Sequence, residues 1–326
     1  MGLFKRTAES AKEEGQATKT DVEQLPGTPP PTVNGVRDFW QHWDYLLSMV
    51  TELKEFGVPM LEAVGLTLNE AIIADSDLGG GVYAGDVMIK KGSRLEPRML
   101  AVMTAMGIRK VMARPRPRVL VIALSSQSVP ASFLAAAQVQ EVGGEIVNRL
   151  EVLSENADEV VRVIDEQLVR ADFVVTVGGF DDSSIDLWDY ASRIGPSDFT
   201  PVALTLGGLH GFIMADGKIP LLALPADASA AFVLAKLVLE PIVLKLMGAT
   251  PDPVLYSAKL AQPIRIIPDM LTCVPASVKA GRMTITGRPQ GFEGLNSIYK
   301  ANALAILASE EDLVNADTEA YYLPLK

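Results

Sequence analysis

The sequence predicts an α/β protein: a three-layer αβα central domain with a mostly parallel sheet, a helical N-terminal part and a C-terminal β part. Between residues 119 and 247, short apolar runs rich in β-branched residues alternate with helical patterns. This alternation is typical of a parallel sheet covered by helices on both faces. Residues 36–53 repeat apolar side chains at three- and four-residue spacings, which predicts an amphipathic helix. After a proline-rich stretch at 251–268, the chain is typical of strands.

The first 114 residues divide into a tail and a domain. Residues 1–34 are expected to be a disordered tail, because Lys, Glu, Gln, Thr and Pro dominate them. A binding arm is the alternative role for this tail. Residues 35–114 are expected to form a first domain that ends at the stiff linker Arg114-Pro115-Arg116-Pro117-Arg118. In it we predict helices at 36–53, 61–73 and 98–106. We predict a hairpin region at 86–95.

The central domain is predicted to cover residues 115–250, and the C-terminal β domain residues 251–326. The apolar segments 212–215 and 218–224 are joined by Asp216-Gly217, which predicts an antiparallel pair. The other predicted strands of the central domain are 119–124, 145–152, 173–177 and 201–206. Its predicted helices are 132–142, 156–170, 183–194 and 228–247. The predicted strands of the C-terminal domain are 272–285, 301–307 and 320–323.

The composition excludes several classes of partner. Forty acidic residues exceed 29 basic ones and give a net charge of −11, whereas nucleic acids and anionic membranes are bound by clustered Lys and Arg. The N-terminus has no apolar signal-peptide core, and no stretch is apolar enough to span a membrane. The single cysteine, Cys273, fits a reducing compartment. We therefore expect a cytoplasmic protein with no nucleic-acid partner and no membrane insertion.

The candidate site is the end of the buried segment 173–177. The pair Gly178-Gly179 ends this predicted strand, and open α/β sheets bind ligands where their strands end. Four aspartates near this edge suit Mg²⁺, which prefers carboxylate oxygens: Asp181, Asp182, Asp186 and Asp227. The alternative is that Asp182 or Ser183 caps the following helix and the others are solvated. His42 has no second ligand nearby in sequence, so we expect it to pack or to lie at the surface rather than to bind a metal. His210 could be a general base or a ligand, but no Cys, second His or Ser-plus-acid pair lies nearby in sequence, so we expect it to have no catalytic role.

Several short motifs, taken in order, resemble one family. After a pair of predicted helices, they are Gly92-Ser93-Arg94-Leu95-Glu96-Pro97, Pro115-Arg116-Pro117-Arg118, Gly178-Gly179, Leu224-Pro225 and Ala301-Asn302-Ala303. Together they are similar to the MoeA molybdopterin molybdenumtransferases and the related E domain of gephyrin, over residues 36–326. The resemblance implies a molybdopterin-binding-like central domain, a β-barrel-like C-terminal domain and a homodimer. It implies molybdopterin and a divalent cation such as Mg²⁺ as ligands, with cofactor-binding positions at Gly178, Gly179, Asp186, Leu224 and Pro225.

The sequence departs from the family where the anion would bind. The family's inserted β domain is replaced by Leu78-Gly79-Gly80-Gly81, so we expect it to be missing. The family's Gly-Gly-Val-Ser-x-Gly-x-x-Asp motif keeps its glycine pair and its final aspartate, Asp186, in this chain. Asp181 and Asp182 are additional negative charges within it. The family's Lys-Pro-Gly-Lys-Pro loop becomes 206–210 without a lysine, and Leu-Pro-Gly-Asn-Pro becomes 224–228. Because phosphate groups need basic side chains and free amides, pterin binding should be weakened.

Three hypotheses follow from this comparison. The first is a MoeA-like pseudoenzyme with a degraded active site, which acts as a non-catalytic dimeric scaffold for a protein partner, as gephyrin's domain anchors peptides. The second is an active molybdopterin molybdenumtransferase, or a molybdopterin carrier, with altered residues. The third is a Mg²⁺-dependent enzyme that uses the aspartates on another phosphorylated substrate. We favour the first, because the changes fall on the groups that would hold a phosphate.

Overall fold

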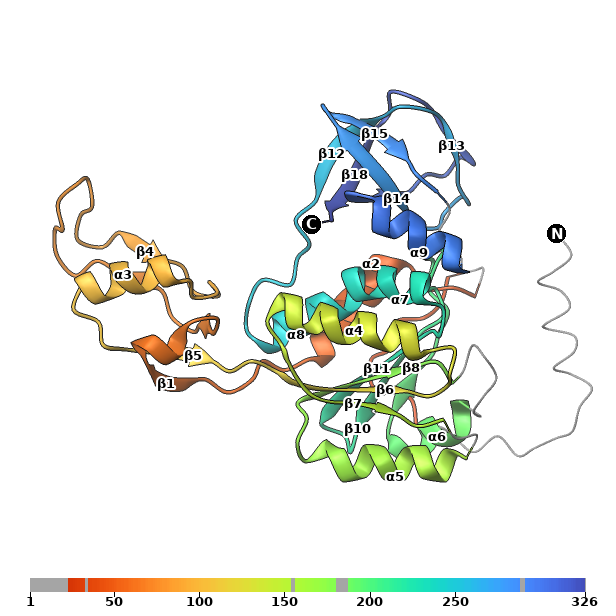
Figure 1. Cartoon of the computed structure of the whole chain (residues 1–326), viewed down its shortest axis with the longest axis horizontal. Coiled ribbons are helices and arrows are strands. Elements are labelled where there is room, and N and C mark those ends of the chain that lie inside the picture. The colour runs from red at the N-terminus through yellow and green to blue at the C-terminus, as the bar shows by residue number, and fades with distance from the viewer. Residues whose placement is uncertain (1–22, 33–34, 154–155, 180–186, 288–290, 326) are drawn as a thin grey trace, which may run out of the picture.

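The computed structural model describes residues 23–32, 35–153, 156–179, 187–287 and 291–325. Figure 1 shows three parts: a central unit of helices and strands, a β unit above it, and an arm that projects to the left. Two connections, residues 50–55 before β1 and residues 115–117 after β5, join the arm to the central unit.

A six-stranded sheet forms the middle layer of the central unit. Its strands are β6 (Arg118–Ala123), β7 (Glu145–Glu151), β8 (Phe173–Val177), β9 (Ser197–Asp198), β10 (Gly211–Ala215) and β11 (Ile219–Leu224). The order is β7-β6-β8-β11-β10-β9, with β7, β6, β8 and β11 parallel and β10 antiparallel to both of its neighbours. The mostly parallel sheet confirms the predicted fold class. The predicted strand at 201–206 does not form: its residues make isolated bridges to Arg37 and Leu271.

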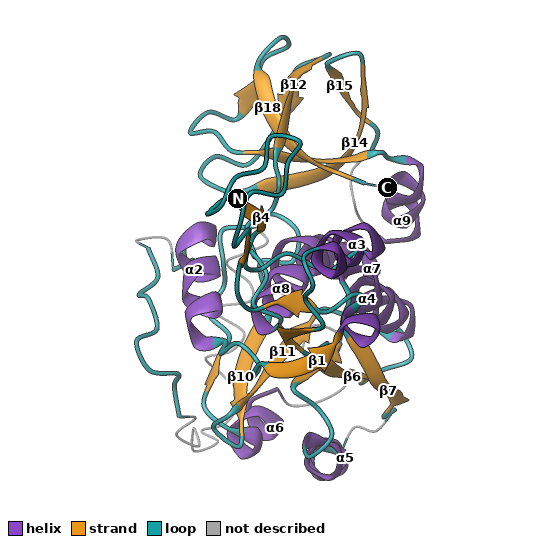
Figure 2. Ribbon diagram, turned by 90° about the vertical axis from the view of Figure 1, so that its left-hand side faces the viewer, coloured by secondary structure: helices purple, strands orange, loops and turns teal. Residues whose placement is uncertain are grey.

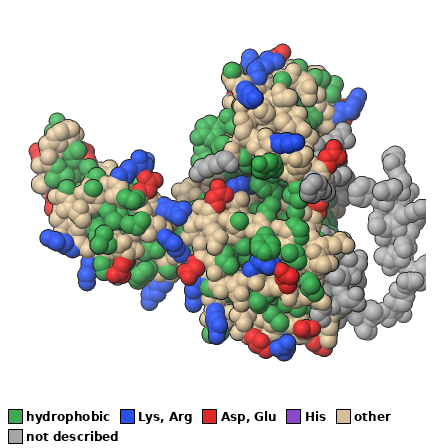
Figure 3. All heavy atoms as spheres, viewed as in Figure 1, with side chains coloured by type: hydrophobic (Ala, Val, Ile, Leu, Met, Phe, Trp, Pro, Cys, Tyr) green, Lys and Arg blue, Asp and Glu red, His purple; other side chains and the backbone are tan. Residues whose placement is uncertain are grey.

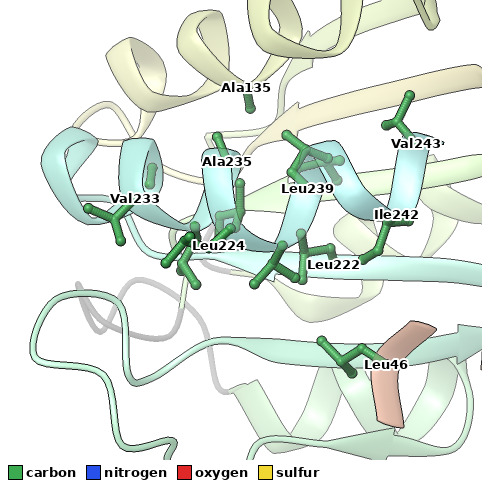
Figure 4. Packing of buried hydrophobic residues seen from close by; sticks show 14 of the residues in the cluster. Leu46, Ala135, Leu222, Leu224, Val233, Ala235, Leu239, Ile242 and Val243 are labelled. Carbon is green, nitrogen blue, oxygen red and sulfur yellow. The ribbon is translucent and has the colours of Figure 1, made fainter. Parts of the chain in front are cut away.

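Helices cover both faces of this sheet. One face packs on α4 (Val129–Val142), α7 (Ala228–Leu234), the π-helical segment η2 (Ala235–Leu239) and α8 (Glu240–Leu246). The other face packs on α5 (Ala157–Leu168) and α6 (Leu187–Ile194) (Figure 2). Because side chains alternate along a strand, Leu222 and Leu224 face the first group, and Figure 4 shows them beneath Val233 and Leu239.

Helix α2 (Phe39–Met49) belongs with the central unit, although the sequence placed it in the first domain. Its residues Phe39, Trp43 and Leu46 join the same hydrophobic cluster as the sheet. The Trp43 indole Nε1–H donates a hydrogen bond of 2.8 Å to the Leu237 carbonyl of η2. The side chain of Asp38 accepts from the amide of Gln41 and caps the start of the helix.

Residues 23–32, which we call the strap, are packed against the central unit rather than disordered. Gln24 forms a parallel bridge with Ser197 of β9, and the Ser197 amide donates to the Glu23 carbonyl at 2.9 Å. Leu25 is buried, with 3% of its surface exposed. The expected disordered tail is therefore wrong for the strap, because a few backbone and apolar contacts outweigh its polar composition. Residues 1–22 and 33–34 lie outside the described part of the chain.

The arm is a small mixed unit with its own core. It contains β1 (Phe56–Pro59), the 3₁₀ turn η1 (Met60–Ala63), β2 (Thr67–Leu68), β3 (Ile72–Ile73), β4 (Val87–Ile89), α3 (Pro97–Ala105) and β5 (Lys110–Arg114). The predicted helix at 61–73 is wrong, because Gly65 adopts φ 80° and turns the chain. The predicted helix at 98–106 is confirmed as α3. Residues 74–86 join β3 to β4 as a loop, where the family resemblance implied a missing domain.

The C-terminal unit is a closed barrel, as the resemblance implied. Its strands are β12 (Tyr256–Leu260), β15 (Arg282–Ile285), β14 (Thr272–Lys279), β16 (Ala303–Leu307) and β18 (Glu319–Pro324). The short pair β13 (Ile264–Arg265) and β17 (Leu313–Val314) and the helix α9 (Gly291–Lys300) complete it. Among the described residues, no helix has the length and apolar character needed to cross a membrane.

Candidate functional site

Four loops of the central unit meet at one edge of the sheet. In the parallel strands β6, β8 and β11, Val177 pairs with Ala123 on one side and with Leu224 on the other, so the three strands end together. Strand β10 is antiparallel and starts at Gly211, opposite Ala223, so the segment before it reaches the same edge. This edge is where an open α/β sheet places a ligand. The loops that line it are 124–128, 178–179, 205–210 and 225–227.

The glycine pair that ends β8 lies beside the Leu224-Pro225 turn. Gly178 and Gly179 have φ values of 79° and 95°, a region that favours glycine. The Gly178 amide donates to the Leu224 carbonyl at 2.8 Å. Four of the positions that the family resemblance selected are thus brought together. The fifth, Asp186, lies outside the described residues.

Asp227 is the N-cap of α7. One of its carboxylate oxygens, Oδ1, accepts from the amides of Ser229 at 3.0 Å and Ala230 at 2.9 Å. This contact places a negative charge at a helix N-terminus, and free amides at such a position can bind an anion. The other predicted metal ligands lie outside the described residues: Asp181, Asp182 and Asp186. Within the described ranges, no three His, Cys, Asp or Glu side chains come together as a metal site.

The loop before α4 is closed by its own serines. The Ser128 amide donates to Ser125 Oγ at 3.2 Å, and the Ser125 amide donates to Ser128 Oγ at 3.1 Å. Ser128 Oγ also donates to the Ser125 carbonyl at 2.8 Å. The polar groups at this end of the loop therefore bond to one another, and the Ser128 amide is already used.

A buried chain of polar groups runs from Asp198 to the 205–210 loop, and no local pattern predicted it. Arg37 is fully buried, and its guanidinium pairs with Asp198 at 2.5 Å. The same guanidinium donates to His42 Nδ1 at 2.9 Å, and His42 Nε2 lies 2.9 Å from His210 Nε2. His210 Nδ1 lies 2.9 Å from the Gly207 carbonyl. The two histidines, which sequence analysis treated separately, are partners 168 residues apart.

These contacts fix where the protons lie. Arg37 only donates, so His42 Nδ1 accepts and His42 Nε2 carries the proton. The Gly207 carbonyl only accepts, so His210 Nδ1 donates and His210 Nε2 accepts from His42. Burial, then the neighbouring His210 and Arg37, lowers the pKa of His42 from 6.5 to about 2. Burial also lowers the pKa of His210, although its bond to Gly207 acts in the opposite direction.

Asp198 is the negative end of this chain. Burial would raise its pKa, but hydrogen bonds from Arg37 and Thr200 lower it below the ordinary value. Thr200 contributes both its amide, at 3.0 Å, and its hydroxyl, at 2.7 Å, to Asp198 Oδ1. The carboxylate therefore stays ionised and balances the Arg37 charge.

A groove of about 800 Å³ separates the start of α2 from the barrel. Its apolar lining includes Phe39, the half-exposed Trp40 and the exposed Ile267. Its acidic lining residues are Asp38, Asp269 and Glu310. The groove is therefore apolar with an acidic border, which suits an apolar group that carries positive charge beside it.

Comparisons with known proteins were made by sequence and by structure. No protein-family model matches the chain. Molybdopterin molybdenumtransferase 1 of Mycobacterium tuberculosis is 27% identical over 203 residues, which are 57% of this chain and 47% of that protein. The molybdopterin molybdenumtransferase of Staphylococcus epidermidis is 27% identical over 250 residues, which are 70% of this chain and 59% of that protein. The chain thus spans about half the length of the curated relatives it matches.

Two solved structures share the fold. A molybdenum cofactor biosynthesis protein from Pyrococcus furiosus has a TM-score of 0.71 at 22% identity, with 88% of this chain and 98% of that chain covered. The molybdopterin biosynthesis MoeA protein from Pyrococcus horikoshii OT3 has a TM-score of 0.73 at 15% identity, with 89% of this chain and 100% of that chain covered. The sequence relatives and the shared architecture agree with the family that the motifs resemble. The chain is therefore a divergent protein of the MoeA family.

Proposed function

We propose that this MoeA-family protein is a non-catalytic binding scaffold, whose sheet-edge site no longer holds a phosphorylated pterin. The observation that carries the proposal is Asp227, whose carboxylate occupies the N-terminus of α7. The loop before α4 is likewise closed, by Ser125 and Ser128. The segments 125–128, 206–210 and 224–228 also contain no Lys or Arg. We include a cytoplasmic location in this proposal, in line with the single buried Cys273.

The free energy lost with the family's two lysines is large enough to abolish tight pterin binding. A hydrogen bond to a charged group contributes about 1.5–3 kcal/mol, so the absence of two lysines alone would weaken binding by about two to four orders of magnitude. A carboxylate placed near the phosphate adds repulsion. The Mg²⁺-dependent alternative is less favoured, because one oxygen of Asp227 is already held by two backbone amides.

Calorimetry with molybdopterin and molybdate tests the proposal. We expect no binding tighter than about 100 µM, because each lost contact costs free energy of the size given above. The molybdopterin molybdenumtransferase of Staphylococcus epidermidis serves as the positive control. Asp227→Ser keeps a helix cap and removes the charge, so we expect it to strengthen the binding of anions. Submicromolar pterin binding by the unmodified chain, or restored molybdoenzyme activity in a strain that lacks its own MoeA, would contradict the proposal.

The groove beside α2 is the proposed docking site of a protein partner. We propose that it takes a peptide with an apolar side chain and flanking Lys or Arg, because its apolar lining is bordered by Asp38, Asp269 and Glu310. Labelled peptides with one Phe between lysines should bind, and the same peptides with glutamates should not. We expect Asp269→Asn with Ile267→Ala to weaken binding at least tenfold. Tyr299→Ala, at an exposed aromatic side chain outside the groove lining, is the control.

We also propose a homodimer formed through the arm. Ile73 and Val87 are cross-strand partners on β3 and β4 and expose 52% and 55% of their surface. Leu78 and Tyr83, in the loop between these strands, are also exposed. Figure 3 shows hydrophobic side chains gathered on the arm. We call these four residues the ribbon patch, and its apolar surface on a projecting unit is typical of an interaction site.

A further inference from the structure

The two histidines of this chain occupy the middle of a buried chain of hydrogen bonds. His42 and His210 are each 2% exposed, and Arg37 is fully buried. The groups that face them are the guanidinium of Arg37, the carboxylate of Asp198 and, beyond Arg37, the ring of Tyr45 at 5.9 Å from its guanidinium carbon. Each ring nitrogen has one partner. In each ring one nitrogen has to accept a hydrogen bond, His42 Nδ1 from Arg37 and His210 Nε2 from His42, which only a neutral ring can do. The arrangement is therefore complete without any proton added.

This chain of hydrogen bonds holds three separate segments together. Arg37 Nε donates to the Pro29 carbonyl of the strap at 2.9 Å. The Arg37 backbone bonds to Pro201 and Ala203, and its guanidinium reaches Asp198 in β9. His210 closes the 205–210 loop through the Gly207 carbonyl. The strap, the edge strand and the loop at the sheet edge thus share a single polar network.

We propose that the His42–His210 pair is an acid-sensitive latch: while both rings are neutral it holds the strap and the 205–210 loop against the sheet, and protonation of either ring releases both. A proton on His210 Nε2 would face the Nε2–H of His42. A proton on His42 Nδ1 would face the guanidinium of Arg37. In either case two N–H groups would point at each other where one hydrogen bond had been. Because both groups are buried, this costs free energy. This inference does not depend on the proposed scaffold function.

The direction of the pH effect follows from the lowered pKa values. In the released state the rings titrate near 6.5, whereas in the closed state they stay neutral well below that pH. The closed state is therefore fully favoured above pH 6.5 and loses its advantage as the pH falls. Between pH 6.5 and 5, the ratio of released to closed molecules should rise about 15-fold for one histidine that stays neutral in the closed state, and at most about 250-fold for the two. Asp198 stays ionised across this range, because its pKa is lowered.

Nitrogen chemical shifts of the imidazole rings test the closed state in the unmodified chain. The chain has two histidines, so the single variants His42→Gln and His210→Gln assign the signals of each ring. At pH 7.5 we expect two neutral rings, with the proton on Nε2 of His42 and on Nδ1 of His210. A ring that titrates near pH 6.5 while the strap stays closed, or the opposite placement of protons, would overturn the latch.

Amide hydrogen exchange of the full-length chain tests the release. After correction for the intrinsic rate, we expect residues 23–32, 35–37 and 205–212 to lose protection together between pH 6.5 and 5, while residues 272–285 of the barrel stay protected. The double variant His42→Gln with His210→Gln cannot titrate in this range. In this variant we expect the exchange protection of the strap and of the 205–210 loop to be the same at pH 6.5 and at pH 5, whether the segments are closed or already released at pH 7.5. The latch is refuted if the double variant retains the acid-driven release, or if the unmodified chain keeps full protection at pH 5.

Discussion

Arg37 is a fully buried guanidinium whose charge is balanced by one carboxylate. Its partner Asp198 is 7% exposed, and their contact is 2.5 Å. A buried ion pair adds little net stability, but the removal of one partner leaves a charge without compensation. Arg37 also donates hydrogen bonds to His42 and to the Pro29 carbonyl of the strap. A shift of its guanidinium would therefore disturb both contacts.

We therefore expect Asp198→Asn to lower the free energy of unfolding by about 3–5 kcal/mol, measured by urea denaturation at pH 7.5. Arg162→Gln is the matched control. It breaks the exposed pair with Glu166, whose side chains are 62% and 55% exposed, and should change stability by less than about 1 kcal/mol. A similar small effect at Asp198 would show that the Arg37 charge is solvated in the folded chain.

At this scale the sequence predicted part of the site. Gly178 and Gly179 could be selected because a strand that ends in paired glycines has a local signature. Arg37 and Asp198 could not, because they are 161 residues apart and neither has a local pattern that marks burial. The histidine pair was missed for the same reason. The partner of a buried polar group depends on tertiary packing, which local spacing does not encode.

Helix α2 is attached to the central unit where a proline interrupts another helix. Pro241 of α8 has no amide proton, so it cannot donate to Leu237, four residues earlier. The Leu237 carbonyl accepts instead from Trp43 Nε1 at 2.8 Å. The interruption therefore creates the acceptor that docks α2, next to the π-helical segment η2.

A double-mutant cycle measures this contact. Trp43→Phe should lower the free energy of unfolding by about 2–4 kcal/mol, because it removes the donor from a buried carbonyl and leaves a small cavity. In the background of Pro241→Ala, residue 241 can donate to Leu237, so the same change should cost about 1 kcal/mol less. Trp40→Phe, on the same helix with a half-exposed side chain, is the control. If Trp43→Phe lowers the free energy of unfolding equally in the two backgrounds, Trp43 does not replace the hydrogen bond that Pro241 cannot donate.

The success of sequence prediction at the scale of elements follows the strength of each pattern. The segments 98–106 and 228–247 are clear helical patterns and were found in nearly the predicted places. The segment 61–73 has apolar spacings that fit a helix, but Gly65 and paired β-branched residues at 72–73 favour turns and short strands. Helix α9 was missed, because Gly291 and Gly294 lower its intrinsic helix propensity.

In the whole molecule, the arm is a separate unit with its own core. It projects from the central unit, and its core cluster is separate from those of the sheet (Figure 1). Arg114 links its end to the body by pairing with Glu52 at 2.7 Å and by donating to the Leu53 carbonyl at 2.5 Å. The ribbon patch lies on β3, β4 and the loop between them, so a second copy that covers it would leave the sheet edge of the central unit free.

Sedimentation equilibrium tests the homodimer. For the unmodified chain at 10 µM we expect twice the monomer mass of 35.0 kDa. Ile73→Ser with Val87→Ser removes the paired apolar side chains of the ribbon patch and should raise the dissociation constant at least 100-fold, because each buried side chain contributes about 1.5–3 kcal/mol. Val169→Ser, at a side chain 81% exposed at the end of α5, should leave the mass unchanged. A monomeric unmodified chain, or a dimer that the ribbon substitutions do not affect, would show that the arm has another partner.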